Sequence, residues 1–355
     1  MGAGPVLRRQ STHRRFRISE PEDIGAARRT AMAYAEQVGA GPGLAGRVGQ
    51  ATTELGTNLL RHATGDRWIL VRPLPPDAVE VLAVDRGPGI ADLPRALGDG
   101  PAPPWTPRGS AAGLGCGLAA VRRSASRFDI HSVPGRGTVV LAVFDPHWRS
   151  PEDVLPASVP PPRHWAGVST SIAEECGDAW AVVETGCDRL VVLLVDGLGH
   201  GVHASIAADA AVRTLALDPE DLAGYLLRAN QALRETRGAA LAGCALRPVE
   251  DRLDCLSVGN INGRVVDGDQ QQGLVPYSGT VGLRVEPPKV PLMGVPWPPG
   301  ATLVLWSDGL DSRIDLTAEA DLLRADPAVT AAVLHRDHSR DRDDATVVVV
   351  RRPAR

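Results

Sequence analysis

Several classes of protein are excluded by residues that the sequence lacks. Lys289 is the only lysine among 355 residues, and it lies outside any G-x-x-x-x-G-K-S/T motif, so a P-loop nucleotide site is excluded. A eukaryotic-type kinase fold, which needs a strand lysine and a catalytic H-R-D loop, is excluded as well. The five cysteines are scattered, odd in number and form no C-x-x-C pair, which argues against a disulfide scaffold and a structural zinc site.

Long apolar runs and long basic runs are also missing. No apolar stretch approaches the ~20 residues that a membrane-spanning helix needs, and the N-terminus lacks the apolar core of a signal peptide. The net charge is −4 without a basic run, so there is no electrostatic case for binding nucleic acid or an anionic membrane. We therefore expect a cytoplasmic protein with reduced thiols, and neither nucleic acid nor a membrane as a partner.

The length of the chain and its prolines indicate two domains. A chain of 355 residues exceeds one average domain of ~100–200 residues. Six prolines between Asp145 and Arg163 favour an extended connection. The predicted parts are a flexible, arginine-rich tail over 1–15, an N-terminal domain over 16–144, a Pro-rich linker over 145–163 and a C-terminal domain over 164–353.

Hydrophobic periodicity predicts an α/β (α+β) fold, in which both domains combine strands with helices. In the N-terminal domain it predicts helices over 21–38 and 44–62 and strands over 68–72, 79–84 and 138–144. In the C-terminal domain it predicts strands over 179–184, 189–195, 301–306 and 346–351 and helices over 202–215 and 219–236. The segment 98–113 is rich in Gly, Pro, Ala and Ser, and long loops of this kind are commonly lids.

Two polar elements of the N-terminal domain are suited to holding a nucleotide. Glu54 and Asn58 are four residues apart on a predicted helix, so their side chains share one face. Asn58 can offer an amide oxygen to Mg²⁺, and Glu54 can accept the proton of an attacking hydroxyl or water. An apolar strand then ends at Asp85, whose carboxylate can accept a hydrogen bond from an adenine amino group, while Gly87 and Gly89 let the backbone approach the ring.

A glycine-rich loop forms the third element, with Gly113, Gly115 and Gly117 at the start of an alanine-rich helix. Backbone amides at a helix N-terminus form an anion site suited to triphosphate oxygens. The spacing differs from the dinucleotide-binding G-x-G-x-x-G. Each element alone is more often a solvent-exposed helix face or a turn, but the three elements in this order indicate a nucleotide site.

This half of the chain resembles the GHKL ATPase superfamily, and specifically the RsbT/RsbW-type serine kinases that act on regulators of bacterial sigma factors. The resemblance covers roughly 16–144, and residues 53–62 match the N-box of that family. It implies an ATPase-type α/β sandwich. The roles that it implies are general base for Glu54, Mg²⁺ ligand for Asn58, adenine contacts for Asp85 and Thr138, and phosphate loop for Gly113, Gly115 and Gly117.

Within the GHKL superfamily, two other kinds of protein fit the sequence less well than an RsbT-type kinase. No dimerisation helix with a phosphoacceptor histidine precedes the domain, which disfavours a sensor histidine kinase. A motor of the gyrase or chaperone type lacks room for its transducer domain before the linker. A kinase of the RsbT type is therefore the expected member.

Acidic residues at strand ends dominate the C-terminal domain. A continuous apolar run over 190–195 reaches Asp196 beside Gly197, and the run over 302–306 is followed by Asp308. An isolated Asp-Gly is usually a turn, but four acidic sites that each adjoin a strand indicate hard divalent ions such as Mg²⁺ and Mn²⁺. His200 and His203 could suggest a transition-metal pair, but no further His or Cys lies at ligand spacing.

These motifs resemble the SpoIIE/RsbX branch of the PPM-type metal-dependent serine/threonine phosphatases, over about 166–351. Val258–Asn260 is similar to the RsbX-like members. The family fold is a β-sandwich flanked by helices, and two metals would activate a bridging water. The implied ligands of two Mn²⁺ or Mg²⁺ ions are the carboxylates of Asp178, Asp196, Asp308 and Asp343 and the carbonyl of Gly197. Asp344 is the alternative to Asp343, and Val182 stands where a second aspartate would support an accessory metal.

The two halves together predict a bifunctional regulator. The N-terminal domain would phosphorylate a serine or threonine on a STAS-type protein, an anti-sigma-factor antagonist or stressosome-type protein, and the C-terminal domain would dephosphorylate such a protein. The alternative is that the N-terminal domain is a nucleotide-gated module that binds a partner, and that only the phosphatase is catalytic.

Overall fold

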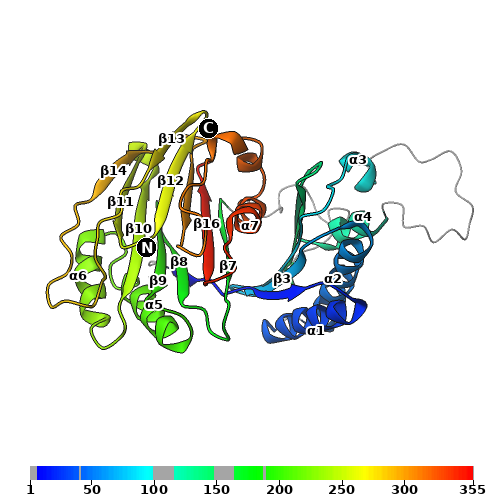
Figure 1. Cartoon of the computed structure of the whole chain (residues 1–355), viewed down its shortest axis with the longest axis horizontal. Helices are drawn as coiled ribbons and strands as arrows, with labels where there is room; N and C mark the ends of the chain where they lie inside the picture. The colour runs from blue at the N-terminus through cyan, green and yellow to red at the C-terminus, as the bar shows by residue number, and fades with distance from the viewer. Residues whose placement is uncertain (1–5, 40, 99–115, 148–163, 187–188, 355) are drawn as a thin grey trace, which may run out of the picture. The chain divides into compact units, whose positions relative to one another are not determined.

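The computed structural model describes residues 6–39, 41–98, 116–147, 164–186 and 189–354. Within it the chain forms two compact units (Figure 1). His13–Pro162 forms the N-terminal unit, and Arg163–Arg355 together with Met1–Thr12 forms the C-terminal unit. The fold class predicted from the sequence is confirmed, because both units combine antiparallel sheets with helices.

The start of the chain forms strands where the sequence predicted a flexible tail over 1–15. β1 (Val6–Arg9) pairs antiparallel with a strand of the C-terminal unit, and β2 (Arg14–Arg17) pairs antiparallel with a strand of the N-terminal unit. Both are edge strands, so their backbones complete a ladder while their arginine side chains stay exposed or half-buried. Arginine content correctly indicated solvation, but solvated side chains do not prevent pairing at a sheet edge.

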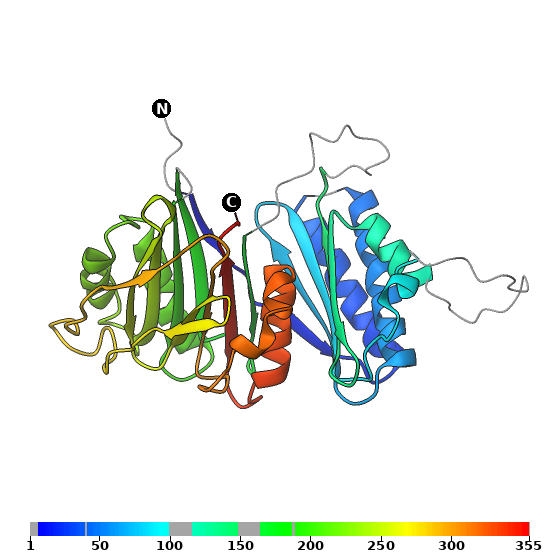
Figure 2. The ribbon, with the colours of Figure 1, turned by 90° about the horizontal axis from the view of Figure 1, so that it is seen from above.

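The N-terminal unit is a five-stranded antiparallel sheet with helices on one face (Figure 2). The strand order is β2-β3-β4-β6-β5. The remaining strands are β3 (Arg67–Leu74), β4 (Ala78–Asp85), β5 (Arg127–Val133) and β6 (Gly137–Phe144), and the helices are α1 (Pro21–Gln37), α2 (Pro42–His62), α3 (Leu93–Ala96) and α4 (Cys116–Ser124). Both predicted helices and all three predicted strands are confirmed, while β5 was missed because polar residues interrupt it and none of it is fully buried.

The C-terminal unit is a sandwich of two antiparallel sheets, ordered β1-β8-β9-β10-β11-β14 and β13-β12-β15-β16-β7. The first sheet contains β8 (Asp178–Gly186), β9 (Arg189–Gly197), β10 (Ala239–Arg247), β11 (Arg252–Val258) and β14 (Met293–Pro296). The second contains β7 (Trp165–Thr170), β12 (Asn262–Asp267), β13 (Gln270–Gly273), β15 (Thr302–Trp306) and β16 (Ala345–Arg351). The four strands predicted here are confirmed as β8, β9, β15 and β16.

Helices cover the outer faces of this sandwich (Figure 1). α5 (Val202–Leu215) and α6 (Leu222–Ala232) pack on the first sheet, and α7 (Pro327–His338) packs on β7 and β16. α5 and α6 were predicted from their periodicity. α7 was missed because its residues from Pro327 to Arg336 are all buried, which leaves no one-sided apolar pattern in the sequence.

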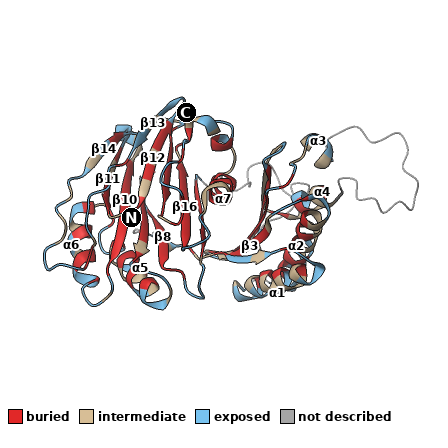
Figure 3. Ribbon diagram, viewed as in Figure 1, coloured by how far each residue is buried: buried red, intermediate tan, exposed pale blue. Residues whose placement is uncertain are grey.

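Apolar side chains form the core of the sandwich between its two sheets. Trp180 and Leu194 of the first sheet lie in one buried cluster with Leu305 and Val348 of the second. Figure 3 shows the buried residues running along the central strands, whereas exposed residues gather at turns and helix surfaces. In the part of the chain that the structure describes, no helix is both long enough and apolar enough to cross a membrane.

Candidate functional site

The predicted adenine aspartate lies at one end of the sheet of the N-terminal unit. β4 is buried along its whole length and carries Asp85 at its last position. Asp85 Oδ1 accepts hydrogen bonds from the backbone N–H groups of Gly87, at 2.7 Å, and Thr138, at 3.3 Å. Two backbone donors on one oxygen fix the orientation of the carboxylate, as a recognition site for one ring edge requires.

The turn after Asp85 is held close to β5 and β6. Gly89 has a φ of +72°, and a Cβ there would collide with the carbonyl oxygen of Val133. Ile90 N–H donates to Ser132 Oγ at 2.8 Å, and Ser132 Oγ lies 2.8 Å from Thr138 Oγ1. The fold therefore places the predicted residues Asp85, Gly87, Gly89 and Thr138 around one sheet end.

The acidic face of α2 meets the start of α4. Glu54 and Asn58 are both half-buried on α2, and a Cβ at Gly117 would lie 2.9 Å from Glu54 Oε2 and 3.6 Å from Asn58 Nδ2. A larger residue at 117 would have to displace the Glu54 carboxylate. The structure thus brings together three predicted residues that are far apart in the sequence.

Other predicted features of this half lie outside the described residues. They are Gly113 and Gly115 of the phosphate loop, the predicted lid from residue 99 onward, and most of the linker. The site of the N-terminal unit is consequently defined here by α2, the end of β4 and the first turn of α4.

Two predicted metal ligands of the C-terminal unit face each other across a strand pair. β8 begins at Asp178, and its register partner on β9 is Asp196. Directly opposed residues in an antiparallel pair have Cβ atoms about 4.5–5.5 Å apart. Gly197 N–H donates to Gly177 O at 3.0 Å, which ties the end of β9 to the residue before β8. The sheet therefore juxtaposes two carboxylates at one end of the β8–β9 strand pair.

The pKa values of these two carboxyl groups are raised. Burial, together with the carboxylates of Asp344 and Asp308, raises the pKa of Asp178 to about 7, against a hydrogen bond from Ser307 Oγ at 2.7 Å. Burial, followed by the carboxylates of Asp178, Asp308 and Asp343, raises the pKa of Asp196 to about 9. Both pKa values are raised because burial and nearby negative charges make the ionised carboxylate less favourable than the protonated carboxyl.

Asp308 and Asp343 lie close to the same end of the β8–β9 strand pair. Asp308 follows β15, and burial and the Asp343 carboxylate raise its pKa. Asn260 Nδ2 donates to Asp308 Oδ2 at 2.5 Å, so Asn260 orients this carboxylate. Its position was noted in the sequence within the motif Val258–Asn260, but its contact with Asp308 depends on how the turn after β11 folds.

Asp344 has different surroundings from its neighbour Asp343. Asp344 is buried, and its carboxylate accepts hydrogen bonds from Ser171 Oγ at 2.7 Å, Ile172 N at 3.0 Å and Gly177 N at 2.5 Å. These donors belong to the loop between β7 and β8. Asp343 is exposed, and the electrostatic effects on Asp196 and Asp308 place it near both.

The carboxylates of the four aspartates are suitable ligands for divalent cations, although the structure does not bring them close enough together to form a complete coordination site. Among the described residues, no three His, Cys, Asp or Glu side chains converge closely enough to form a metal cluster. The four aspartates nevertheless influence one another electrostatically, and carboxylate oxygens are the ligands that Mg²⁺ and Mn²⁺ prefer. Bound cations would remove the repulsion that raises the pKa values of Asp178 and Asp196.

Comparison with known proteins gives a family match for each half of the chain. Residues 18–144 match the model of the histidine kinase-like ATPase domain, and residues 186–353 match that of stage II sporulation protein E. The serine/threonine-protein kinase RsbT of Bacillus subtilis (strain 168) is 32% identical over 130 residues, which are 36% of this chain and 92% of RsbT.

Two solved structures are similar to the chain. One is a chain from the bacterial stressosome, a modular system adapted to control secondary messenger signalling, with a TM-score of 0.49 and 23% identity over 53% of this chain and 98% of that one. The other contains the PP2C phosphatase domain and a fragment of the regulatory domain of SpoIIE from Bacillus subtilis, with a TM-score of 0.45 and 17% identity over 79% of this chain and 81% of that one.

By these matches the chain joins a histidine kinase-like ATPase domain to a domain that is similar to stage II sporulation protein E. Through its N-terminal unit, the chain belongs to the family of the serine/threonine-protein kinase RsbT. The match to an ATPase domain agrees in general terms with the prediction of ATP as the cofactor of the first domain.

Proposed function

We propose that the chain switches the phosphorylation state of a STAS-domain protein in both directions. The N-terminal unit phosphorylates a serine or threonine of this protein with ATP and Mg²⁺, and the C-terminal unit removes phosphate with two Mn²⁺ or Mg²⁺ ions. The match to RsbT supports the first activity, and the match to stage II sporulation protein E supports the second. The partner is an anti-sigma-factor antagonist or a stressosome-type protein.

The kinase proposal assigns a role to each residue of the first site. Asp85, held by two backbone amides, binds the adenine edge, and Thr138 lies beside it. Asn58 holds Mg²⁺, and Gly117 at the start of α4 lies beside the Glu54 carboxylate. Glu54 then accepts the proton of the partner's hydroxyl. ATP, when bound, supplies the phosphoryl group.

The phosphatase proposal assigns the metal ligands as Asp178, Asp196, Asp308, Asp343 and the carbonyl of Gly197. Two bound cations would supply an activated water and neutralise phosphoryl charge. Ser307 holds Asp178, and Asn260 holds Asp308, so that both carboxylates keep one orientation. Asp344 fixes the loop before β8 instead of binding metal, because its oxygens already accept three hydrogen bonds.

One observation carries the phosphatase proposal. Asp178 and Asp196 are register partners, both are largely desolvated, and the charges around Asp196 are those of further aspartates. A protein gains no stability from such an arrangement, since like charges in a desolvated place oppose each other. A bound cation is the partner that makes the arrangement favourable.

Two assays test the proposal. Purified protein should release phosphate from a phosphoserine peptide when Mn²⁺ is added, and excess chelator should stop the reaction. Protein incubated with ATP and a small STAS protein should transfer phosphate to it, and Glu54→Ala should lose this transfer, whereas Glu36→Ala on the exposed side of α1 should keep it.

The outcomes separate the two readings of the N-terminal unit. Transfer by Glu54→Ala at the wild-type rate would remove the assignment of the general base. ATP binding without transfer to any STAS partner would favour the nucleotide-gated binding module. Phosphate release in the presence of excess chelator would refute the metal-dependent phosphatase.

A further inference from the structure

The connection between α6 and β10 ends beside the proposed metal ligands of the C-terminal unit. β10 begins at Ala239, whose register partner on β9 is the proposed ligand Gly197. Leu198 N–H donates to Gly238 O at 3.0 Å, so the pairing continues one residue beyond each strand. Arg237 directly precedes Gly238. It therefore belongs to the same end of the sheet as the proposed ligands.

The side chain of Arg237 lies against the loop 198–201, which joins β9 to α5. A Cβ atom at Gly199 would lie 3.1 Å from Arg237 Nη1, so the glycine lets the guanidinium approach the backbone of this loop closely. The same loop contacts the start of β8, because a Cβ atom at Gly177, the residue before Asp178, would lie 3.2 Å from Gly199 O. Gly199 is therefore next to both the guanidinium and the start of β8.

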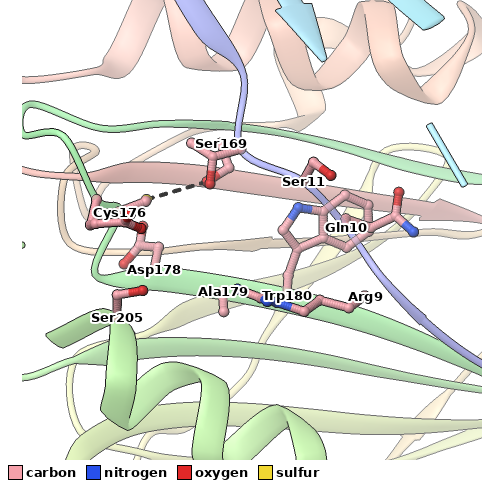
Figure 4. A pocket seen from close by; sticks show the side chains of 11 residues that line it. Arg9, Gln10, Ser11, Ser169, Cys176, Asp178, Ala179, Trp180 and Ser205 are labelled. Atoms are coloured by element: carbon pink, nitrogen blue, oxygen red, sulfur yellow. Dashed lines mark hydrogen bonds between the residues drawn. The ribbon is translucent and has the colours of Figure 1, made fainter. Parts of the chain in front are cut away.

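The helix that follows this loop also adjoins the start of β8. Ser205, in the first turns of α5, lines one polar cavity together with Cys176 and Asp178 (Figure 4). All residues that line this cavity belong to the C-terminal unit. The loop that contacts Arg237 and the helix after it are consequently part of the immediate surroundings of Asp178.

Arg237 differs from another arginine at this end of the unit. Arg340 Nε pairs with Asp311 Oδ1 at 3.1 Å, so its guanidinium already has an anionic partner. Arg237 is exposed, and among the residues that the structure describes its guanidinium has neither an ion-pair partner nor a hydrogen-bond partner. An arginine that only balanced the charge of the aspartates would pair with one of them. The donors of Arg237 are therefore available to an anion from outside the chain.

The guanidinium group matches the anion that the proposed reaction brings. A phosphorylated side chain carries about two negative charges at neutral pH and three acceptor oxygens. Arginine presents its N–H donors in a planar fork that can bind two of these oxygens at once. A phosphate monoester held by metal ions at the aspartates would bring its oxygens to the end of the sheet where Arg237 lies.

We propose that Arg237 binds the phosphoryl oxygens of the substrate and makes the phosphatase site selective for dianionic phosphate monoesters. The inference rests on the phosphatase function proposed above. The contact forms when the substrate binds and is present before the reaction, so it contributes mainly to affinity. Arg237 is thus a substrate-binding residue outside the set of acidic metal ligands.

Removal of the guanidinium should weaken substrate binding more than turnover. Arg237→Gln should raise KM for a phosphoserine peptide about tenfold and leave kcat nearly unchanged, because it removes charge-assisted hydrogen bonds of the bound state. Arg237→Lys keeps the charge but loses the planar fork, so its KM should lie between those of wild type and Arg237→Gln. The matched control is Arg234→Gln, at an exposed arginine of the same connection, which should keep the wild-type KM.

Binding is also measured without turnover. Calorimetric titration of the Mg²⁺-loaded protein with inorganic phosphate, the product of the reaction, should give a Kd about tenfold higher for Arg237→Gln than for wild type. If the wild type hydrolyses the peptide but Arg237→Gln has the same KM and the same phosphate Kd, the assignment of Arg237 is overturned. An equal loss of affinity in Arg234→Gln would overturn it too, because the effect would then be one of net charge. Failure of the wild type to hydrolyse the peptide with Mn²⁺ would instead overturn the proposed phosphatase.

Discussion

Glu80 in the N-terminal unit can be compared with Asp178 and Asp196 in the C-terminal unit, since all three are carboxylates on strands, Glu80 and Asp178 buried and Asp196 half-buried. Glu80 is fully buried on β4, where its Oε1 accepts from Arg72 Nε at 2.8 Å and lies 3.0 Å from His13 Nε2. Burial alone would raise its pKa, but Arg72, His13 and Arg127 outweigh burial and hold the pKa well below its ordinary value.

The two aspartates have no such compensation. Further carboxylates act on both, and their pKa values move in the opposite direction, to about 7 and about 9. A buried carboxylate with cationic partners is part of the fold, because its charge is already neutralised. We propose that the group of carboxylates around Asp178 and Asp196, which lacks enough cationic partners, binds a cation.

The strongest test of this contrast is the loss of phosphatase activity. Asp196→Ala should lower Mn²⁺-dependent hydrolysis of a phosphoserine peptide at least about a thousandfold, because it removes a carboxylate that holds the cations. Steady-state phosphate release at saturating Mn²⁺ measures this. The matched control is Asp267→Ala, at the exposed end of β12, which should retain wild-type activity. Activity of Asp196→Ala within tenfold of wild type would contradict the assignment.

Glu80→Gln should act on stability rather than on phosphatase activity. The substitution leaves the Arg72 guanidinium, which is 1% exposed, without its anionic partner. Removing one member of a buried ion pair costs about 3–5 kcal/mol. Hydrogen–deuterium exchange of peptides from β3 and β4 should report faster opening, whereas Glu36→Gln, exposed on α1, should change nothing. Protection equal to wild type would show that Glu80 is not structurally required.

The contrast between the two carboxylate groups could be only partly predicted from the sequence. Asp178 and Asp196 were proposed as ligands because each adjoins an apolar strand and a glycine, and such local signals can be recognised in a sequence. Glu80 gave no signal, since its partners His13 and Arg72 reach it through strand pairing. The strands that were confirmed have continuous apolar runs, whereas β1 and β2 are short, arginine-rich edges whose pairing depends on distant partners.

The division of roles between Asp343 and Asp344 could not be decided from two adjacent aspartates either. It depends on which carboxylate the loop between β7 and β8 approaches, and that loop lies far away in the sequence. The same applies to Asn260 and Gly117, whose contacts with Asp308 and Glu54 arise only after the elements pack.

Adjacent substitutions separate these two roles. Asp344→Ala should lower the free energy of unfolding of the metal-free protein by about 2 kcal/mol, because it leaves the buried N–H of Gly177 and the part-buried N–H of Ile172 without this acceptor. Asp343→Ala should leave that free energy nearly unchanged and should instead weaken Mn²⁺ binding. Denaturant unfolding with chelator and calorimetric titration with Mn²⁺ measure the two effects. If Asp343→Ala unfolds more easily and Asp344→Ala loses Mn²⁺ affinity, the assignment is reversed.

The smallest predicted effect is a pH dependence with opposite signs in the two units. The folded state of the metal-free C-terminal unit keeps protons on Asp178 and Asp196 up to pH values of about 7 and about 9, whereas their ordinary pKa is 3.8. This contribution to stability is complete below pH 3.8 and is lost as the pH rises through the folded-state values.

For Glu80 the folded-state pKa is depressed, so its contribution is present above pH 4.5 and is lost as the pH falls. In excess chelator, the melting temperature of the C-terminal unit should therefore fall on the order of 5 °C between about pH 6 and about pH 9, and Mn²⁺ should restore it by replacing the protons. Asp196→Asn should flatten this slope. A melting temperature that is independent of both pH and Mn²⁺ in the wild type would mean that the charges of Asp178 and Asp196 are already balanced in the folded protein. These aspartates would then not differ from Glu80.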